Sequence, residues 1–125
     1  MSSWTEQELQ QVDKTDELQV TSHRPDGTLR PYVTIWTARV GDDVYVRSAY
    51  GPDNGWFRRA KVSGTGRVRV GGVERDVRFE VPDDDVHAQL DDAYRAKYGR
   101  YSERIVSTVV GPELVAATLR AVPQD

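Results

Sequence analysis

The fold is decided by residues 31–48, which read PYVTIWTARVGDDVYVRS. Residues 31–40 carry β-branched and aromatic side chains on both faces of an extended chain. Residues 41–43, Gly-Asp-Asp, predict a turn, and residues 44–48 continue as a second strand. Because both faces of the first strand are partly apolar, it suits a barrel in which one face packs inside and the other is covered.

Shorter strands flank this pair. Alternating apolar and polar residues predict them at about residues 18–20, 67–70, 73–81 and 114–122. Residues 71–72, Gly-Gly, are a two-residue hairpin signal between two of these strands. Residues 24–27, Arg-Pro-Asp-Gly, predict a tight turn, and Pro123 stops the last strand.

Helices are predicted around the strands. Thr5 and Glu8 have the spacing of a capping box, so a helix is expected over residues 5–14. Asn54 is placed to cap a short helix at residues 56–61, and residues 102–109 predict another. The resulting order describes one α+β domain over residues 1–125, a small barrel with peripheral helices rather than a parallel α/β sheet.

The longest predicted helix follows Pro82 and three aspartates at residues 83–85, whose carboxylates suit the positive end of a helix dipole. Tyr94 and Tyr98 lie one turn apart on its apolar face, where we expect them to lock the helix to the barrel. Asp91 and Arg95 have the i, i+4 spacing of an ion pair. A metal site formed by the aspartates and His87 is the weaker interpretation, since capping explains them better.

Composition excludes several classes of site. The 125 residues contain no cysteine, which excludes disulfides, thiolate nucleophiles and thiolate metal sites. They contain only two histidines. No apolar run approaches the roughly 20 residues of a membrane helix, and no secretory signal is visible, so a cytoplasmic location is expected. The net charge is −3 and no nucleic-acid-binding motif is present, so we expect no nucleic-acid partner.

The region most suggestive of chemistry runs from residue 45 to residue 61. A strand ends at Arg47 and Ser48, a glycine-bracketed loop follows, and Arg58 and Arg59 lie in the first turn of a helix. Guanidinium and hydroxyl groups with free amides at a helix start favour phosphate. Two aromatic residues, Tyr50 and Trp56, could pack against the flat ring of a ligand. The alternative is a solvated basic face with Trp56 in the core.

A family resemblance rests on three stretches, residues 30–36, 41–48 and 51–60. They resemble the split-barrel flavin-binding superfamily. Within it, the chain is most similar to a bacterial family of uncharacterised small proteins, which share its pattern through residues 66–68, 71–72 and 91–99. A more distant similarity is to deazaflavin-dependent nitroreductases.

The resemblance implies a six-stranded split barrel, commonly a homodimer with FMN or a deazaflavin between the subunits. By position, four residues would hold phosphate or its approach loop and two would border the ring: Arg47, Ser48, Trp56 and Arg59, then Thr34 and Trp36. The implied activity is an oxidoreductase acting by cofactor hydride transfer on an unknown small molecule. Some split barrels bind no cofactor, so the alternative is a cofactor-free small-ligand-binding or accessory protein on the same scaffold. No catalytic side chain is assigned.

Overall fold

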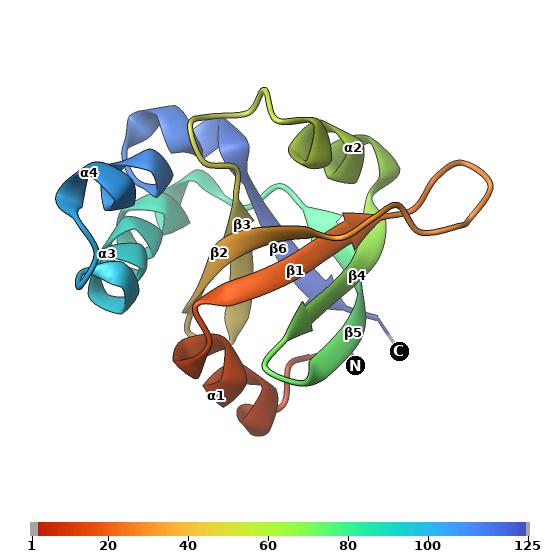
Figure 1. Cartoon of the computed structure of the whole chain (residues 1–125), viewed down its shortest axis with the longest axis horizontal. Coiled ribbons are helices and arrows are strands. Elements are labelled where there is room, and N and C mark those ends of the chain that lie inside the picture. Colours follow the sequence, from red (N-terminus) through yellow and green to blue (C-terminus); the bar gives the residue numbers. More distant parts are fainter. Residues whose placement is uncertain (1–2, 125) are drawn as a thin grey trace.

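The computed structural model describes residues 3–124, and its six strands form a closed barrel in the order β1-β2-β3-β6-β5-β4 (Figure 1). Every neighbouring pair is antiparallel. The strands are β1 Glu17–Ser22, β2 Val33–Val40, β3 Asp43–Arg47, β4 Thr65–Val70, β5 Val73–Glu80 and β6 Thr118–Pro123. The α-helices are α1 Glu6–Lys14, α2 Gly55–Ser63, α3 His87–Tyr98 and α4 Glu103–Val106. The predicted α+β barrel with peripheral helices is confirmed.

The barrel interior is apolar because alternate residues of each strand point inward. Its buried strand residues include Leu18, Val20, Val44, Val46, Val68, Val70, Val77, Phe79, Leu119 and Ala121. Helix α1 contributes Leu9 and Val12 to this core, and helix α2 contributes Phe57 and Ala60. The two helices lie at opposite ends of the barrel in Figure 1. The predicted capping box of α1 is present, with reciprocal hydrogen bonds between Thr5 and Glu8.

A second core lies outside the barrel, between β2 and α3. Leu90, Tyr94 and Tyr98 of α3 are completely buried there, together with Ala38 of β2 and Tyr45 of β3. The Tyr98 hydroxyl accepts a hydrogen bond from the Thr37 amide at 3.0 Å. Tyr94 and Tyr98 therefore attach α3 to the barrel, as their spacing predicted. No helix among residues 3–124 is long and apolar enough to cross a membrane.

Two local predictions are wrong. Residues 114–117 were expected to begin the last strand, but Pro112–Ala117 forms a 3₁₀ helix and β6 begins at Thr118. The apolar run there does not alternate, so its period cannot distinguish a buried turn of helix from a strand. Asn54 precedes α2, but its side chain makes no capping hydrogen bond.

Candidate functional site

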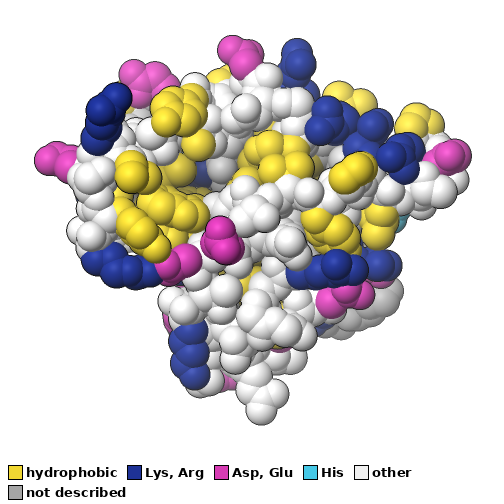
Figure 2. Space-filling view, viewed as in Figure 1, with side chains coloured by type: hydrophobic (Ala, Val, Ile, Leu, Met, Phe, Trp, Pro, Cys, Tyr) yellow, Lys and Arg dark blue, Asp and Glu magenta, His cyan; other side chains and the backbone are white. Residues whose placement is uncertain are grey.

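Two cavities lie on either side of α2. The first, which we call the aromatic cavity, has a volume of about 510 Å³ and lies between β2, the loop after β3 and the segment following α3. Its lining includes Val33, Thr34, Ile35, Trp36, Arg47, Tyr50, Trp56 and Ile105. In Figure 2, hydrophobic side chains border a hollow between the regions of α2 and α4. A flat, largely apolar molecule matches this lining.

The two indoles that line the aromatic cavity, Trp36 and Trp56, each pack against a neighbouring aromatic ring. Trp36 stacks on Tyr98 of α3, with ring centroids 3.9 Å apart and planes 3° apart. Trp56 at the start of α2 meets the ring of Phe57 edge-on at 5.8 Å. Both indoles are half-buried, so each keeps a surface available to a ligand while its position is set from behind.

The loop between β3 and α2 presents Tyr50 at the rim of this cavity. Tyr50 has a φ of 68°, a left-handed conformation that costs a non-glycine residue about 1–2 kcal/mol. The loop is held by Ser48, whose hydroxyl donates to the Gly51 carbonyl at 2.6 Å, and by Asn54, whose amide donates to the Ser48 hydroxyl at 2.7 Å. This bracing leaves the Tyr50 side chain 87% exposed.

Arg47 forms part of the floor of the aromatic cavity, and its hydrogen bonds are made within the protein. Its guanidinium donates to Asp91 at 2.5 Å, to the Val109 carbonyl and the Thr118 hydroxyl at 2.9 Å each, and lies 3.2 Å from Nδ1 of His87. The Arg47 side chain is completely buried. The predicted Asp91–Arg95 ion pair is therefore wrong: Asp91 pairs with Arg47, 44 residues away.

The second cavity, which we call the arginine cavity, has a volume of about 810 Å³ and lies between α2 and the loop joining β1 to β2. Among residues 3–124, its lining includes four arginines, Arg24, Arg30, Arg58 and Arg59, and no Asp or Glu. Lys and Arg side chains gather at this side of the molecule in Figure 2. This gathering of guanidinium groups favours an anionic ligand.

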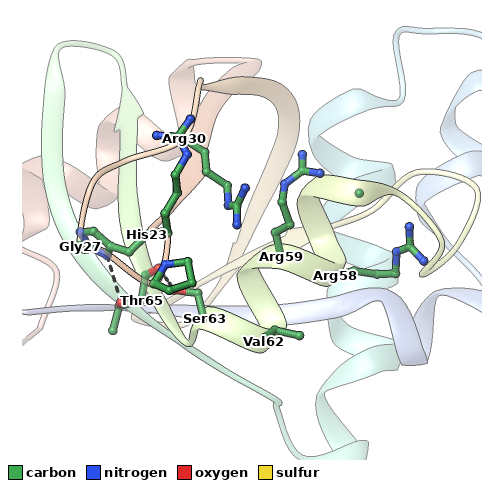
Figure 3. A pocket seen from close by; sticks show the side chains of 11 residues that line it. His23, Gly27, Arg30, Arg58, Arg59, Val62, Ser63 and Thr65 are labelled. Atoms are coloured by element: carbon green, nitrogen blue, oxygen red, sulfur yellow. Dashed lines mark hydrogen bonds between the residues drawn. The ribbon is translucent and has the colours of Figure 1, made fainter.

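Three of the four guanidinium groups are available to a ligand. Among the residues that the structure describes, Arg24 donates to the Leu29 carbonyl at 2.9 Å, whereas Arg58 and Arg59 form no side-chain hydrogen bond or ion pair. Nε of Arg30 is buried without a hydrogen-bond partner. Figure 3 shows Arg30 and Arg59 reaching into the gap from opposite elements, while Arg58 extends away from the loop. A buried, unpartnered donor beside free cations suits a bound anion.

A small space of about 10 Å³ lies beside the start of α2 and shares lining residues with both cavities. Arg30 and Arg59 line both this space and the arginine cavity, while Val33 and Trp56 line both the space and the aromatic cavity. The apolar, ring-lined cavity and the cationic cavity are therefore neighbours on either side of the start of α2.

The structure distributes the predicted site residues over this surface. Thr34, Trp36, Arg47, Tyr50 and Trp56 line the aromatic cavity, and Arg58 and Arg59 line the arginine cavity. Ser48 is buried, lines neither cavity and braces the intervening loop. Sequence reasoning missed Arg24 and Arg30 of the β1–β2 loop, although arginines flanking a Pro-Asp-Gly turn were a visible signal.

The fold is shared with solved structures of low sequence identity. A conserved hypothetical protein from Mycobacterium tuberculosis has a TM-score of 0.71 and 13% identity, over 99% of this chain and 83% of that one. An FAD-binding protein from Mesorhizobium loti has a TM-score of 0.54 and 19% identity, over 98% and 92%. A protein described as an F420 reductase has a TM-score of 0.55 and 17% identity, over 93% and 92%. These similarities show that the barrel is a split barrel.

Sequence comparison identifies the family. A search of curated protein sequences found no match. Residues 8–121 match the family described as an uncharacterised protein conserved in bacteria, DUF2255, and the chain therefore belongs to that family.

Proposed function

We propose that this protein binds a flavin-type cofactor, FMN or a deazaflavin, with the ring system in the aromatic cavity and the phosphate in the arginine cavity. The observation that carries the proposal is that an apolar, ring-lined cavity and a cationic cavity are neighbours, with Trp56 and Arg59 both bordering the small space beside the start of α2. A flavin-type cofactor has the same division into a flat heterocycle and an anionic tail. Split barrels described as FAD-binding and as an F420 reductase support the proposal.

The residues present fit such a molecule. The aromatic cavity offers indole surfaces at Trp36 and Trp56, whose positions Tyr98 and Phe57 stabilise. The arginine cavity offers the unpartnered Nε of Arg30 and the free guanidinium of Arg59. The Arg47 guanidinium already donates to Thr118, Asp91 and Val109. We therefore propose that Arg47 stabilises the floor of the aromatic cavity and does not bind the phosphate.

When bound, the cofactor supplies hydride transfer, and the activity we propose is that of an oxidoreductase acting on a small molecule. The protein binds and orients the ring, keeps water from its apolar face and neutralises the phosphate. Thr34 is exposed on the aromatic cavity and can donate or accept a hydrogen bond at the ring edge. This division of labour needs no nucleophilic side chain, in agreement with the absence of cysteine.

A titration of the purified protein with FMN and with a deazaflavin, followed by cofactor fluorescence, tests the proposal. Arg59→Ala and Arg30→Ala should each weaken binding by about 1.5–3 kcal/mol, because a charged hydrogen bond to phosphate is lost. That loss corresponds to an increase in Kd of roughly ten- to a hundredfold. Lys61→Ala is the matched control, since Lys61 is an exposed cation of α2 that lines neither cavity.

Equal Kd values for wild type, Arg59→Ala and Arg30→Ala would remove these arginines from the site. Failure of the wild type to bind either compound would reject the cofactor and favour the second candidate, a cofactor-free protein that binds a small anionic ligand. The arginine cavity, which no carboxylate of the described residues lines, is the observation that supports this alternative. Isothermal titration with inorganic phosphate and pyrophosphate then distinguishes an anion site from an unused surface.

A further inference from the structure

A column of aromatic rings leads from the aromatic cavity to the outside of the protein. Trp36 lines the cavity and stacks on Tyr98 at 3.9 Å. The ring of Tyr101 lies beside the same indole, with centroids 5.1 Å apart and planes inclined by 34°. Tyr101 is 38% exposed. The indole of Trp36 therefore contacts both the cavity and a tyrosine that solvent reaches.

The surroundings of the phenol groups distinguish Tyr101 from its neighbours. The Tyr101 hydroxyl donates to the carboxylate of Asp16 at 2.6 Å. The Tyr98 hydroxyl donates to the backbone carbonyls of Asp16 and Thr37, and the Tyr94 hydroxyl lies 3.5 Å from the carbonyl of Trp36. A carboxylate is a much stronger proton acceptor than a backbone carbonyl and can take the proton of an oxidised phenol. Tyr101 is the tyrosine of this column whose hydroxyl contacts a carboxylate.

Hydrogen bonds from its neighbours stabilise the ionised form of the Asp16 carboxyl group. Its carboxylate is hydrogen-bonded by Tyr101 and by Arg100, and both contacts lower its pKa from the ordinary value. Burial raises the pKa of Tyr98, so that phenol stays protonated. An oxidised phenol is a strong acid, so even a carboxylate of lowered pKa takes its proton. The pair Tyr101–Asp16 thus combines an oxidisable ring, a proton acceptor and access to solvent.

We propose that Trp36, Tyr101 and Asp16 form a one-electron relay that carries oxidising equivalents from the aromatic cavity to the protein surface. The relay rests on the proposed function, because the cofactor ring is the redox-active group expected in that cavity. Its chemical partner at the surface is a small one-electron reductant, such as ascorbate or a thiol. The relay would protect the residues of the aromatic cavity from oxidative damage when a cofactor ring bound there is photoexcited or undergoes one-electron transfer.

Each step of the relay balances. Trp36 would lose one electron to a one-electron oxidant, a photoexcited ring of the flavin type, held in the aromatic cavity. Tyr101 then gives one electron to the oxidised indole while its phenolic proton moves to the Asp16 carboxylate. The neutral tyrosyl radical finally takes one electron from the reductant and recovers the proton from Asp16. Trp36, Tyr101 and Asp16 end as they began, with one electron moved from the reductant to the cavity.

Pulse radiolysis with azide radicals tests the relay without any cofactor, because these radicals oxidise indoles directly. In the wild type, the absorption of the tryptophan radical should decay while that of a tyrosyl radical grows. Trp36→Phe and Tyr101→Phe should each abolish the fast phase of this growth. Asp16→Asn keeps a hydrogen-bond acceptor but loses the base, so the phase should slow by at least about tenfold.

The control variant is Tyr32→Phe, since Tyr32 lies just before β2, against Arg69 and outside the column. It should leave the fast phase unchanged, and circular dichroism checks that each variant is folded. Retention of the fast phase in Tyr101→Phe, or its loss in Tyr50→Phe instead, would overturn the relay. A failed cofactor titration would leave these kinetics unaffected, so the two proposals fail separately.

Discussion

At the scale of single residues, Gly55 positions the guanidinium of Arg59. A Cβ at residue 55 would lie 2.6 Å from Nη1 of Arg59 and 3.4 Å from its Cζ. Glycine at the first residue of α2 therefore lets the arginine fold back over the helix start, beside the small space that shares lining residues with both cavities. The atom in the way belongs to the end of a flexible side chain, so the helix itself can accept a larger residue.

We predict that Gly55→Ala weakens FMN or deazaflavin binding without destabilising the protein. Alanine favours a helix over glycine by about 1 kcal/mol, so thermal stability should be equal or higher. The displaced Arg59 guanidinium should raise the Kd, though less than Arg59→Ala does, because its charge remains nearby. Thermal denaturation and the same fluorescence titration measure the two effects. An unchanged Kd in Gly55→Ala would show that the observed position of Arg59 is irrelevant to binding.

Residue types and spacing were sufficient to find part of the site. Arg59 and Trp56 follow a glycine-bracketed loop, and local sequence alone marked that loop as a place for an anion and a ring. Arg30 was missed because it is remote in sequence and becomes a neighbour of Arg59 only when the barrel closes. Arg47 has the right type for phosphate, but its partner Asp91 lies on another element and could not be seen in a local pattern.

At the scale of elements, Arg47 joins β3 to α3, to β6 and to the segment before residue 112. His87 begins α3 and packs against this guanidinium. Burial lowers the pKa of His87, Arg47 lowers it further, and the carboxylates of Asp84 and Asp91 oppose the shift. His87 is therefore held as a neutral imidazole in the folded protein.

This arrangement predicts a loss of stability in mild acid. The pKa of His87 lies below its ordinary value of 6.5, so the unfolded chain binds a proton at a higher pH than the folded chain does. Its contribution is fully present above pH 6.5 and declines as pH falls toward the folded pKa. The lowered pKa values of Glu8, Asp16 and Glu80 act in a separate window, below their ordinary values of about 4.

Thermal denaturation between pH 7.5 and about 5 measures this effect, since histidine titrates in that range. The Tm of the wild type should fall in this interval, and His87→Gln should flatten the curve because glutamine does not titrate. His23→Gln, which removes the other imidazole of the chain, should retain the wild-type slope. If His23→Gln removed the pH dependence of the Tm and His87→Gln preserved it, the effect would come from His23, which would contradict the prediction.

Periodicity predicted most elements and failed where it was ambiguous. The hairpin at Gly71-Gly72 and the capping box at Thr5 are local signals, and both hold in the structure. Residues 114–117 are apolar without alternation, so they fit a strand and a 3₁₀ helix equally well. Asn54 has the residue type of a cap, but its amide instead binds Ser48 and Ala49, which lie in the preceding loop.

At the scale of the whole molecule, barrel closure creates the candidate site. Pairing of β1 with both β2 and β4 places the loop between β1 and β2 at the same end of the barrel as α2, as Figure 1 shows. The six-stranded split barrel was expected from the family resemblance, whereas the two cavities could not be predicted from sequence because each combines side chains from separate elements.

The rim of the aromatic cavity also predicts the assembly of the protein. Tyr50 is 87% exposed and Ile105 is 48% exposed, and both line the cavity. Exposed apolar groups at a rim mark a contact surface, and we propose that a second copy of the chain covers them in a homodimer. Light scattering should give twice the 14.1 kDa of one chain, and Ile105→Asp should shift the mass toward that of the monomer. A monomeric wild type at high protein concentration would contradict this.

The most direct measurement of the central claim uses the three indole groups of the chain. The indole N–H signals of the ¹⁵N-labelled protein are recorded while FMN or a deazaflavin is added. The signals of Trp36 and Trp56 should shift, because both rings line the aromatic cavity. The signal of Trp4 should stay in place, because its N–H is buried and donates to the Ala121 carbonyl. Three unmoved signals at saturating concentrations of both compounds would contradict the account.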